Sequence, residues 1–325
     1  DASASGSADF TVTGDTDIGG NLSVVNLQTG GDGVLLFTST GALTVGGTIT
    51  LTGVARAGST TTATVTGDAT ITGVTTITGG TGGAATLNVN GVTNVFTGGV
   101  AFAGTTTSAI LSLTPTAAST FTGTIDTAVG GTGTVNVLGG ANVLTFASNI
   151  GATQEILALR IGDPGAGGAA VFNGSVEAVA IAVDGITASS ADFNGNVGSA
   201  ALATGTITVT GFAGAAASAS FAGNVTVASI TLDKDTSDAT ATFDGTVAQT
   251  VVGDIVAAGD DEGVLVISNA AGVTFNDNIG VAAAGIGSIT IASGASLTQK
   301  ALAAGDDLTF DVVGNVDDGA AGTGG

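Results

Sequence analysis

The stretch Ala191-Asp192-Phe193-Asn194-Gly195-Asn196-Val197, followed by Thr206-Ile207-Thr208-Val209-Thr210, decides the fold. In the first segment, Phe193, Gly195 and Val197 occupy alternate positions, so an extended chain directs all three to one face. In the second segment, Ile207 and Val209 occupy one face and three threonines occupy the other. This alternation is typical of half-buried β-strands and lacks helical spacing.

The same phrase recurs along the chain, which predicts a repeat protein. Unequal steps between its copies favour an all-β fold, a parallel β-solenoid (β-helix) with irregular coils of about 20–35 residues, because turns can absorb insertions while strands stay in register. Tandem β-sandwich domains, with phenylalanine as ordinary core, are the alternative. The copies begin at Phe172, Phe193, Phe221, Phe243 and Phe275, which lie 21, 28, 22 and 32 residues apart, and an earlier copy begins at Phe121.

A solenoid places equivalent residues of successive coils above one another. We therefore expect Phe193 to stack on the phenylalanine of each neighbouring coil, at a spacing of about 4.8 Å. Asparagines that directly follow the phenylalanines, at Asn173, Asn194 and Asn276, are expected to form an amide ladder at a turn.

Changes in the predominant residue types and motifs along the chain suggest four regions. Residues 1–30 are expected to form the first coil or a strand donated to another copy. Residues 31–115 are a Thr-rich β-repeat region and residues 116–316 a Phe-motif solenoid, with Pro115 as the candidate boundary. Residues 317–325 are rich in glycine and resemble a tail or linker. The start of the chain has no basic segment and no apolar run, so we expect a processed or truncated product.

Charge and composition exclude several classes of partner. The chain of 325 residues has 26 acidic and four basic residues, for a net charge of −22. Such a surface repels phosphate backbones and anionic lipids, so we expect no nucleic-acid partner. Nothing approaches 18 consecutive apolar residues, so we expect no membrane span. High salt or divalent cations would screen the self-repulsion.

The residues that usually carry catalysis are absent. The chain contains no histidine and no cysteine, so a Ser-His-Asp triad, a cysteine nucleophile and an imidazole base are all impossible. We predict that the protein is not an enzyme. A polysaccharide hydrolase that uses paired carboxylates is a less favoured alternative, because the chain has no tryptophan or tyrosine on which sugar rings could stack.

Acidic clusters are the remaining chemical feature. Oxygen ligands on turns are the type that calcium prefers, so these clusters predict calcium binding. The alternative is that they are solvated loop tips that keep a β-rich surface soluble. The candidate ligands are Asp233, Asp235, Asp238, Asp260 and Asp261.

The Phe-Asn-Gly-Asn-Val and Phe-Asp-Gly-Thr-Val phrases, which alternate with Thr-Ile-Thr strands, resemble the passenger regions of rickettsial-type surface antigens. Those are autotransporter-like β-solenoids that coat bacterial cells. In composition the chain is also similar to bacterial surface-layer (S-layer) proteins. The resemblance covers mainly residues 120–316. It implies a secreted protein at the bacterial cell surface, with a coat or adhesive role.

We therefore expect an extracellular structural protein that self-assembles, as a head-to-tail homopolymer, into a surface layer or filament. An adhesin passenger domain that binds another cell, with cell-surface glycans as possible ligands, is the alternative. An ice- or mineral-binding solenoid is less favoured. It is suggested by the threonine pairs Thr48/Thr50, Thr64/Thr66 and Thr206/Thr208.

Overall fold

The computed structural model describes residues 7–26, 33–104, 108–163, 165–185, 187–212, 214–300 and 312–317. These residues form 31 strands and no helix. The strands build a parallel β-solenoid of about 11 turns, which confirms the predicted fold. Neighbouring strands within each sheet run parallel, which excludes the antiparallel β-sandwich alternative. The chain divides into two compact units, residues 1–160 and 161–325.

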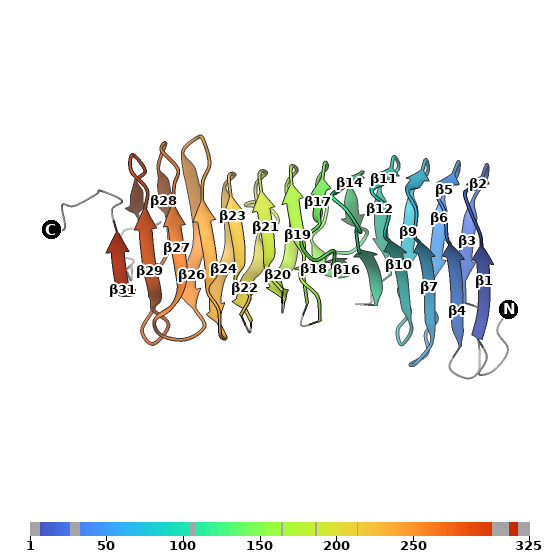
Figure 1. Cartoon of the computed structure of the whole chain (residues 1–325), viewed down its shortest axis with the longest axis horizontal. Coiled ribbons are helices and arrows are strands. Elements are labelled where there is room, and N and C mark those ends of the chain that lie inside the picture. The colour runs from blue at the N-terminus through green and yellow to red at the C-terminus, as the bar shows by residue number, and fades with distance from the viewer. Residues whose placement is uncertain are drawn as a thin grey trace. The chain divides into compact units, whose positions relative to one another are not determined.

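The first unit has three strands in most coils, and each strand belongs to a different sheet (Figure 1). The first sheet contains β1 (Ser7–Val12), β4 (Val34–Ser39), β7 (Thr60–Val65), β10 (Ala84–Val89), β13 (Ala109–Leu113) and β16 (Thr132–Val137). The second contains β2 (Thr16–Ile18), β5 (Leu43–Val45), β8 (Ala69–Ile71), β11 (Thr93–Phe96), β14 (Ser119–Thr122) and β17 (Val143–Phe146). The third contains β3 (Leu22–Val25), β6 (Ile49–Thr52), β9 (Thr75–Thr78), β12 (Val100–Ala103) and β15 (Ile125–Thr127).

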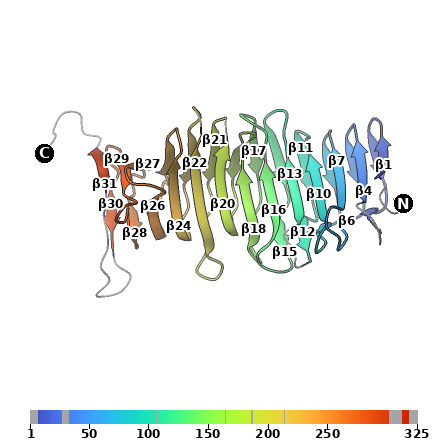
Figure 2. The same cartoon turned by 90° about the horizontal axis from the view of Figure 1, so that it is seen from below.

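Alternation along these strands fills the interior of the first unit. In β7, Thr61, Ala63 and Val65 are buried, while the residues between them are half-exposed. Figure 2 shows β4, β7, β10, β13 and β16 side by side as one layer. Pro115 lies between β13 and β14, inside this unit. Residues 7–26 form the first coil of their own chain, because β1, β2 and β3 pair with β4, β5 and β6.

The second unit has two main strands in each coil, and several strands of its first sheet are longer. That sheet contains β20 (Ala178–Gly185), β22 (Thr204–Gly211), β24 (Val225–Lys234), β26 (Gln249–Ala257), β28 (Val273–Phe275) and β30 (Leu297–Gln299). The other sheet contains β19 (Ala169–Phe172), β21 (Ser189–Phe193), β23 (Ala217–Phe221), β25 (Ala239–Phe243), β27 (Glu262–Ile267), β29 (Ile286–Ile291) and β31 (Val312–Asp317). Strand β18 (Ile156–Ile161) spans the division between the units.

A column of stacked phenylalanines forms one edge of the second unit's core, as predicted. Phe193 is fully buried. Its ring lies 4.9 Å from that of Phe172 and 5.3 Å from that of Phe221, with interplanar angles of 11° and 7°. The column continues to Phe243 at 5.2 Å. Beside it, the Asn194 side-chain amide donates to Asn173 Oδ1 at 3.0 Å, which confirms the predicted amide ladder for this pair.

The expectation that Phe275 and Asn276 continue this column and ladder is wrong. Phe275 lies in β28, in the other sheet, where it pairs with Val251 and Gln299. The position after Phe243 in the column is occupied by Ile267. The Phe275 ring therefore meets Phe243 edge-on, at 85°, across the core.

Glycine is required beside the phenylalanine column because successive turns lie in contact. A Cβ added to Gly195 would stand 2.2 Å from the carbonyl oxygen of Gly174, and one added to Gly223 would stand 2.4 Å from that of Gly195. Real Cβ atoms do not approach backbone this closely, so a larger residue would push the coils apart.

Candidate functional site

The predicted calcium ligands lie at one corner of the second unit, but they do not form one site. Asp233 is the second-last residue of strand β24, and Asp235 and Asp238 follow this strand in the turn to β25. Lys234 Nζ forms an ion pair with Asp238 Oδ1 at 3.0 Å. The hydrogen bond and charge of Asp238, and more weakly the charges of Asp261 and Glu262, raise the pKa of Lys234.

Asp260 and Asp261 lie in the turn between β26 and β27, and part of this turn already has backbone partners. Asp260 Oδ1 accepts from the backbone N–H of Gly285 at 3.2 Å. Glu262 Oε2 accepts from the backbone N–H of Gly259 at 2.9 Å. Within the described part of the chain, no three carboxylate, imidazole or thiol groups gather where they could hold a metal ion. Calcium binding by these aspartates stays a prediction.

Asp233 offers a test of the electrostatics at this corner. Burial raises the pKa of its carboxyl group, and the charges of Glu262 and Asp235 raise it further. A raised folded-state pKa means that the ionised carboxylate destabilises the fold. This cost is absent below the ordinary Asp pKa of 3.8 and is complete above the raised value.

We expect Asp233→Asn to increase the free energy of unfolding at pH 7, by less than about 1 kcal/mol because the group is partly solvated. Denaturant melts at pH 7 and at pH 3 measure the change, and the gain should disappear at the lower pH. Asp17→Asn, at an exposed position of β2, is the control. An equal increase in the free energy of unfolding at both pH values would contradict the view that the ionised Asp233 carboxylate destabilises the fold.

Other acidic and amide side chains hold neighbouring coils together. Asp15 Oδ1 accepts from the backbone N–H of Ala42 at 2.9 Å, and Asp68 Oδ1 accepts from those of Val92 and Thr93 at 2.8 and 2.9 Å. Asn224 Oδ1 accepts from the backbone N–H of Thr250 in the same way, at 2.9 Å. Several acidic and amide residues at corners therefore have a structural role.

A buried amide pair connects three coils of the second unit. Gln249 and Asn269 are 2% and 0% exposed. Gln249 Nε2 donates to the carbonyl oxygens of Phe221 and Gly223, at 2.8 and 2.9 Å. Gln249 Oε1 accepts from the backbone N–H of Gly245 at 3.1 Å and from Asn269 Nδ2 at 2.7 Å. All four polar contacts of this side chain are inside the protein.

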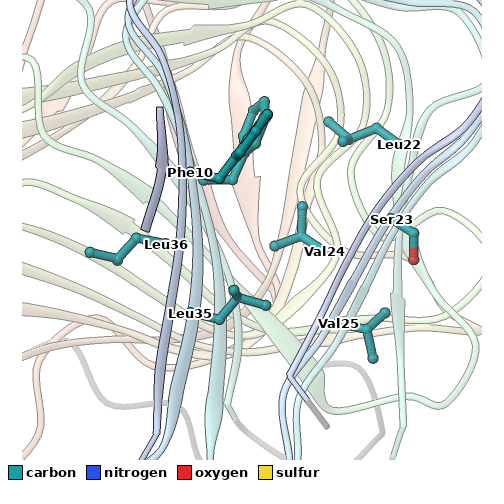
Figure 3. A pocket seen from close by; sticks show the side chains of 8 residues that line it. Phe10, Leu22, Ser23, Val24, Val25, Leu35 and Leu36 are labelled. Atoms are coloured by element: carbon teal, nitrogen blue, oxygen red, sulfur yellow. The ribbon is translucent and has the colours of Figure 1, made fainter. Parts of the chain in front are cut away.

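The first coil forms one end of the described core of the first unit, and part of its apolar surface is exposed there. Strand β1 has β4 as its neighbour and presents its other edge without a partner among the described residues. Phe10 stacks on Phe37 at 5.9 Å, yet 62% of it is exposed. A hollow of about 260 Å³ adjoins it. Figure 3 shows Phe10, Leu22, Val24 and Leu35 facing this hollow. We call this surface the first-coil end.

The surroundings of the first-coil end are acidic. Asp9, Asp15 and Asp17 are all exposed on the first coil. The sequence predicts a strand within residues 1–30 but does not predict the apolar hollow. Phe10 could have indicated this hollow, because it is a large apolar residue in the first strand of the chain, ahead of every other coil.

Threonines of the third sheet form a registered array on the outer face. Thr50 pairs with Thr76, and Thr52 pairs with Thr78, on neighbouring strands. Of the predicted pairs, Thr64 accepts a hydrogen bond from Asn88 Nδ2 at 3.2 Å. Thr206 and Thr208 flank the buried Ile207 on β22. Ice or mineral binding by these threonines stays a prediction.

These observations define the class of the protein as a parallel β-solenoid whose described surface has an apolar end and acidic corners. No protein-family model, no curated protein and no solved structure matches the chain significantly. Among the residues that the structure describes, there is no helix long and apolar enough to cross a membrane.

Proposed function

We propose that this chain is an extracellular structural protein that self-assembles, through its first-coil end, into a surface layer or filament. The observation that supports the proposal is the first-coil end itself, where an apolar hollow lies beside a strand edge that has no partner among the described residues. Unpaired edges recruit further strands unless they are covered. An exposed ring such as that of Phe10 adds about 1.5–3 kcal/mol of driving force when it is buried.

Charge opposes this association and makes it depend on salt. Copies with a net charge of −22 repel one another, and the exposed Asp9, Asp15 and Asp17 concentrate negative charge at the first coil. At an ionic strength of about 0.15 M the repulsion is screened beyond about 8 Å. Assembly is therefore favoured in a salt-rich extracellular setting. Calcium bridges between aspartates of neighbouring copies would add to the screening.

The extracellular setting and the coat role are also supported by the resemblance to rickettsial-type surface antigens and surface-layer proteins. Adhesion to another cell, through cell-surface glycans, is the second role that this resemblance supports. A structural role requires no catalytic group, which suits a chain without histidine or cysteine.

The test compares two substitutions at exposed apolar residues. Phe10→Asp places a charge in the first-coil end, whereas Val247→Asp changes a residue that is equally exposed, at 67% against 62%, but lies in the second unit. We expect Phe10→Asp to lower the polymer mass at least tenfold, because a charge cannot be buried without a partner. Val247→Asp should assemble like the unchanged protein.

Sedimentation and electron microscopy of the purified proteins at high ionic strength measure this difference. A parallel series with EDTA separates calcium bridging, which chelation would remove, from simple screening, which it would not. Equal assembly of both variants, or no assembly of the unchanged protein under any salt condition, would contradict the proposal.

A further inference from the structure

We infer that Asn173 and Asn224, in the turns that follow β19 and β23, carry N-linked glycans. This inference rests on the proposed extracellular role, because the acceptor pattern for such glycans acts only in an exported protein. The pattern is Asn-X-Ser/Thr without proline, and the chain has it at Asn173-Gly174-Ser175 and Asn224-Val225-Thr226. Chance also produces such triplets, so their presentation on the surface decides whether they are acceptors.

The side-chain oxygen of each asparagine is held by the next coil. Asn224 Oδ1 accepts from the backbone N–H of Thr250 at 2.9 Å, and Asn173 Oδ1 accepts from Asn194 Nδ2 at 3.0 Å. Both asparagines are exposed, and their Nδ2 atoms donate to no other described residue. A glycan is attached to Nδ2, so it would leave the bonds of Oδ1 to the next coil intact.

The third residue of each triplet supplies the hydroxyl group that the pattern requires. Residues two positions apart in an extended chain point to the same side. Val225 is fully buried between Asn224 and Thr226, so these two neighbours lie on the outer side, where Thr226 is half-exposed. Ser175 is also half-exposed, directly before the buried Val176. Amide and hydroxyl are therefore accessible together.

The coil between the two triplets has no acceptor. Its asparagine at this corner, Asn196, is exposed and accepts from the backbone N–H of Asn224 at 2.9 Å, but Val197 and Gly198 follow it. The two glycans would thus lie two coils apart, about 10 Å along the axis, instead of crowding adjacent coils. Bulky, hydrated glycans would exclude this corner from contacts between copies, so it would face the medium in an assembled layer.

The modification forms a bond between Nδ2 and the anomeric carbon of a sugar. The donor is an oligosaccharide that is attached through a diphosphate to a lipid carrier. The bond between its sugar and the diphosphate breaks, the lipid diphosphate leaves, and Nδ2 loses a proton.

Mass spectrometry of peptides from the protein, isolated from the cells that make it, tests the inference. A glycan-releasing amidase in heavy-oxygen water converts each glycan-bearing asparagine into labelled aspartate. We expect label at Asn173 and Asn224 and none at Asn196. Asn194, which precedes a glycine as Asn173 does, measures spontaneous deamidation.

Variants secreted from a host that has an oligosaccharide transferase separate the triplet from its surroundings. Thr226→Val removes the hydroxyl but keeps Asn224, and we expect it to abolish the glycan there, whereas Thr226→Ser should retain it. A glycan on the Thr226→Val protein would overturn the inference, as would label at Asn194 or Asn196 equal to that at the two triplets. Unlabelled Asn173 and Asn224 in protein recovered from the outer cell surface would overturn it and leave the proposed role intact. Absence of the protein from the cell surface would refute both.

Discussion

Replacing Phe193 by alanine is expected to lower the free energy of unfolding by about 3–5 kcal/mol. The ring is fully buried between Phe172 and Phe221, at 4.9 and 5.3 Å. Alanine would remove both stacking contacts and leave a cavity that neighbouring coils cannot close without losing register. Denaturant melts of the purified monomer, at low ionic strength, measure the loss.

Phe10→Ala is the matched control for this prediction, because it truncates the same side chain where 62% of it is exposed. We expect it to cost less than about 1 kcal/mol, since most of this ring already contacts water. A similar loss for both variants, or a loss below about 1 kcal/mol for Phe193→Ala, would mean that the phenylalanine column does not hold the coils together.

The second large effect is expected for Gln249→Leu. Its amide makes hydrogen bonds with the backbone of Phe221, Gly223 and Gly245 and with the side chain of Asn269. Leucine fills a similar volume but removes all four bonds. The Phe221 carbonyl oxygen keeps the backbone N–H of Asp244, and Asn269 Nδ2 keeps the carbonyl oxygen of Val247. The Gly245 N–H and the Gly223 carbonyl oxygen lose the bonds that the Gln249 amide makes to them, and each such group costs about 1–3 kcal/mol. We therefore expect the free energy of unfolding to fall by about 3 kcal/mol or more.

Gln154→Leu makes the same change at an exposed position, where the effect should stay within about 0.5 kcal/mol. Both variants are compared with the unchanged protein in the same denaturant melts. A decrease of less than about 1 kcal/mol in the free energy of unfolding for Gln249→Leu would show that water or a local rearrangement can replace the amide. The buried pair of Gln249 and Asn269 would then not stabilise the contact between coils.

The fold could be predicted from the sequence because its signal is local and repeated. Alternation around Phe193 indicates strands, and the recurrence of the phrase indicates coils. Phe275 was misplaced for the same reason, since its local phrase matches the others although it belongs to the opposite sheet. Only long-range pairing shows that Ile267 continues the column.

The acidic residues could not be interpreted from the sequence, because their partners are distant in the chain. Asp68 accepts from backbone groups 24 and 25 residues away, and Asp260 from one 25 residues away. Local spacing of carboxylates indicates oxygen ligands whether the partner is a cation or a backbone N–H. The first-coil end was hidden in the same way, because the hollow joins side chains from three strands.

X-ray fibre diffraction from aligned polymers tests the assembly most directly. If copies stack coil on coil through the first-coil end, the strands lie across the polymer, and the reflection near about 4.8 Å falls along its axis. Polymers built instead by side-to-side contact of solenoids would place that reflection perpendicular to the axis. Such a pattern would contradict assembly through the first-coil end.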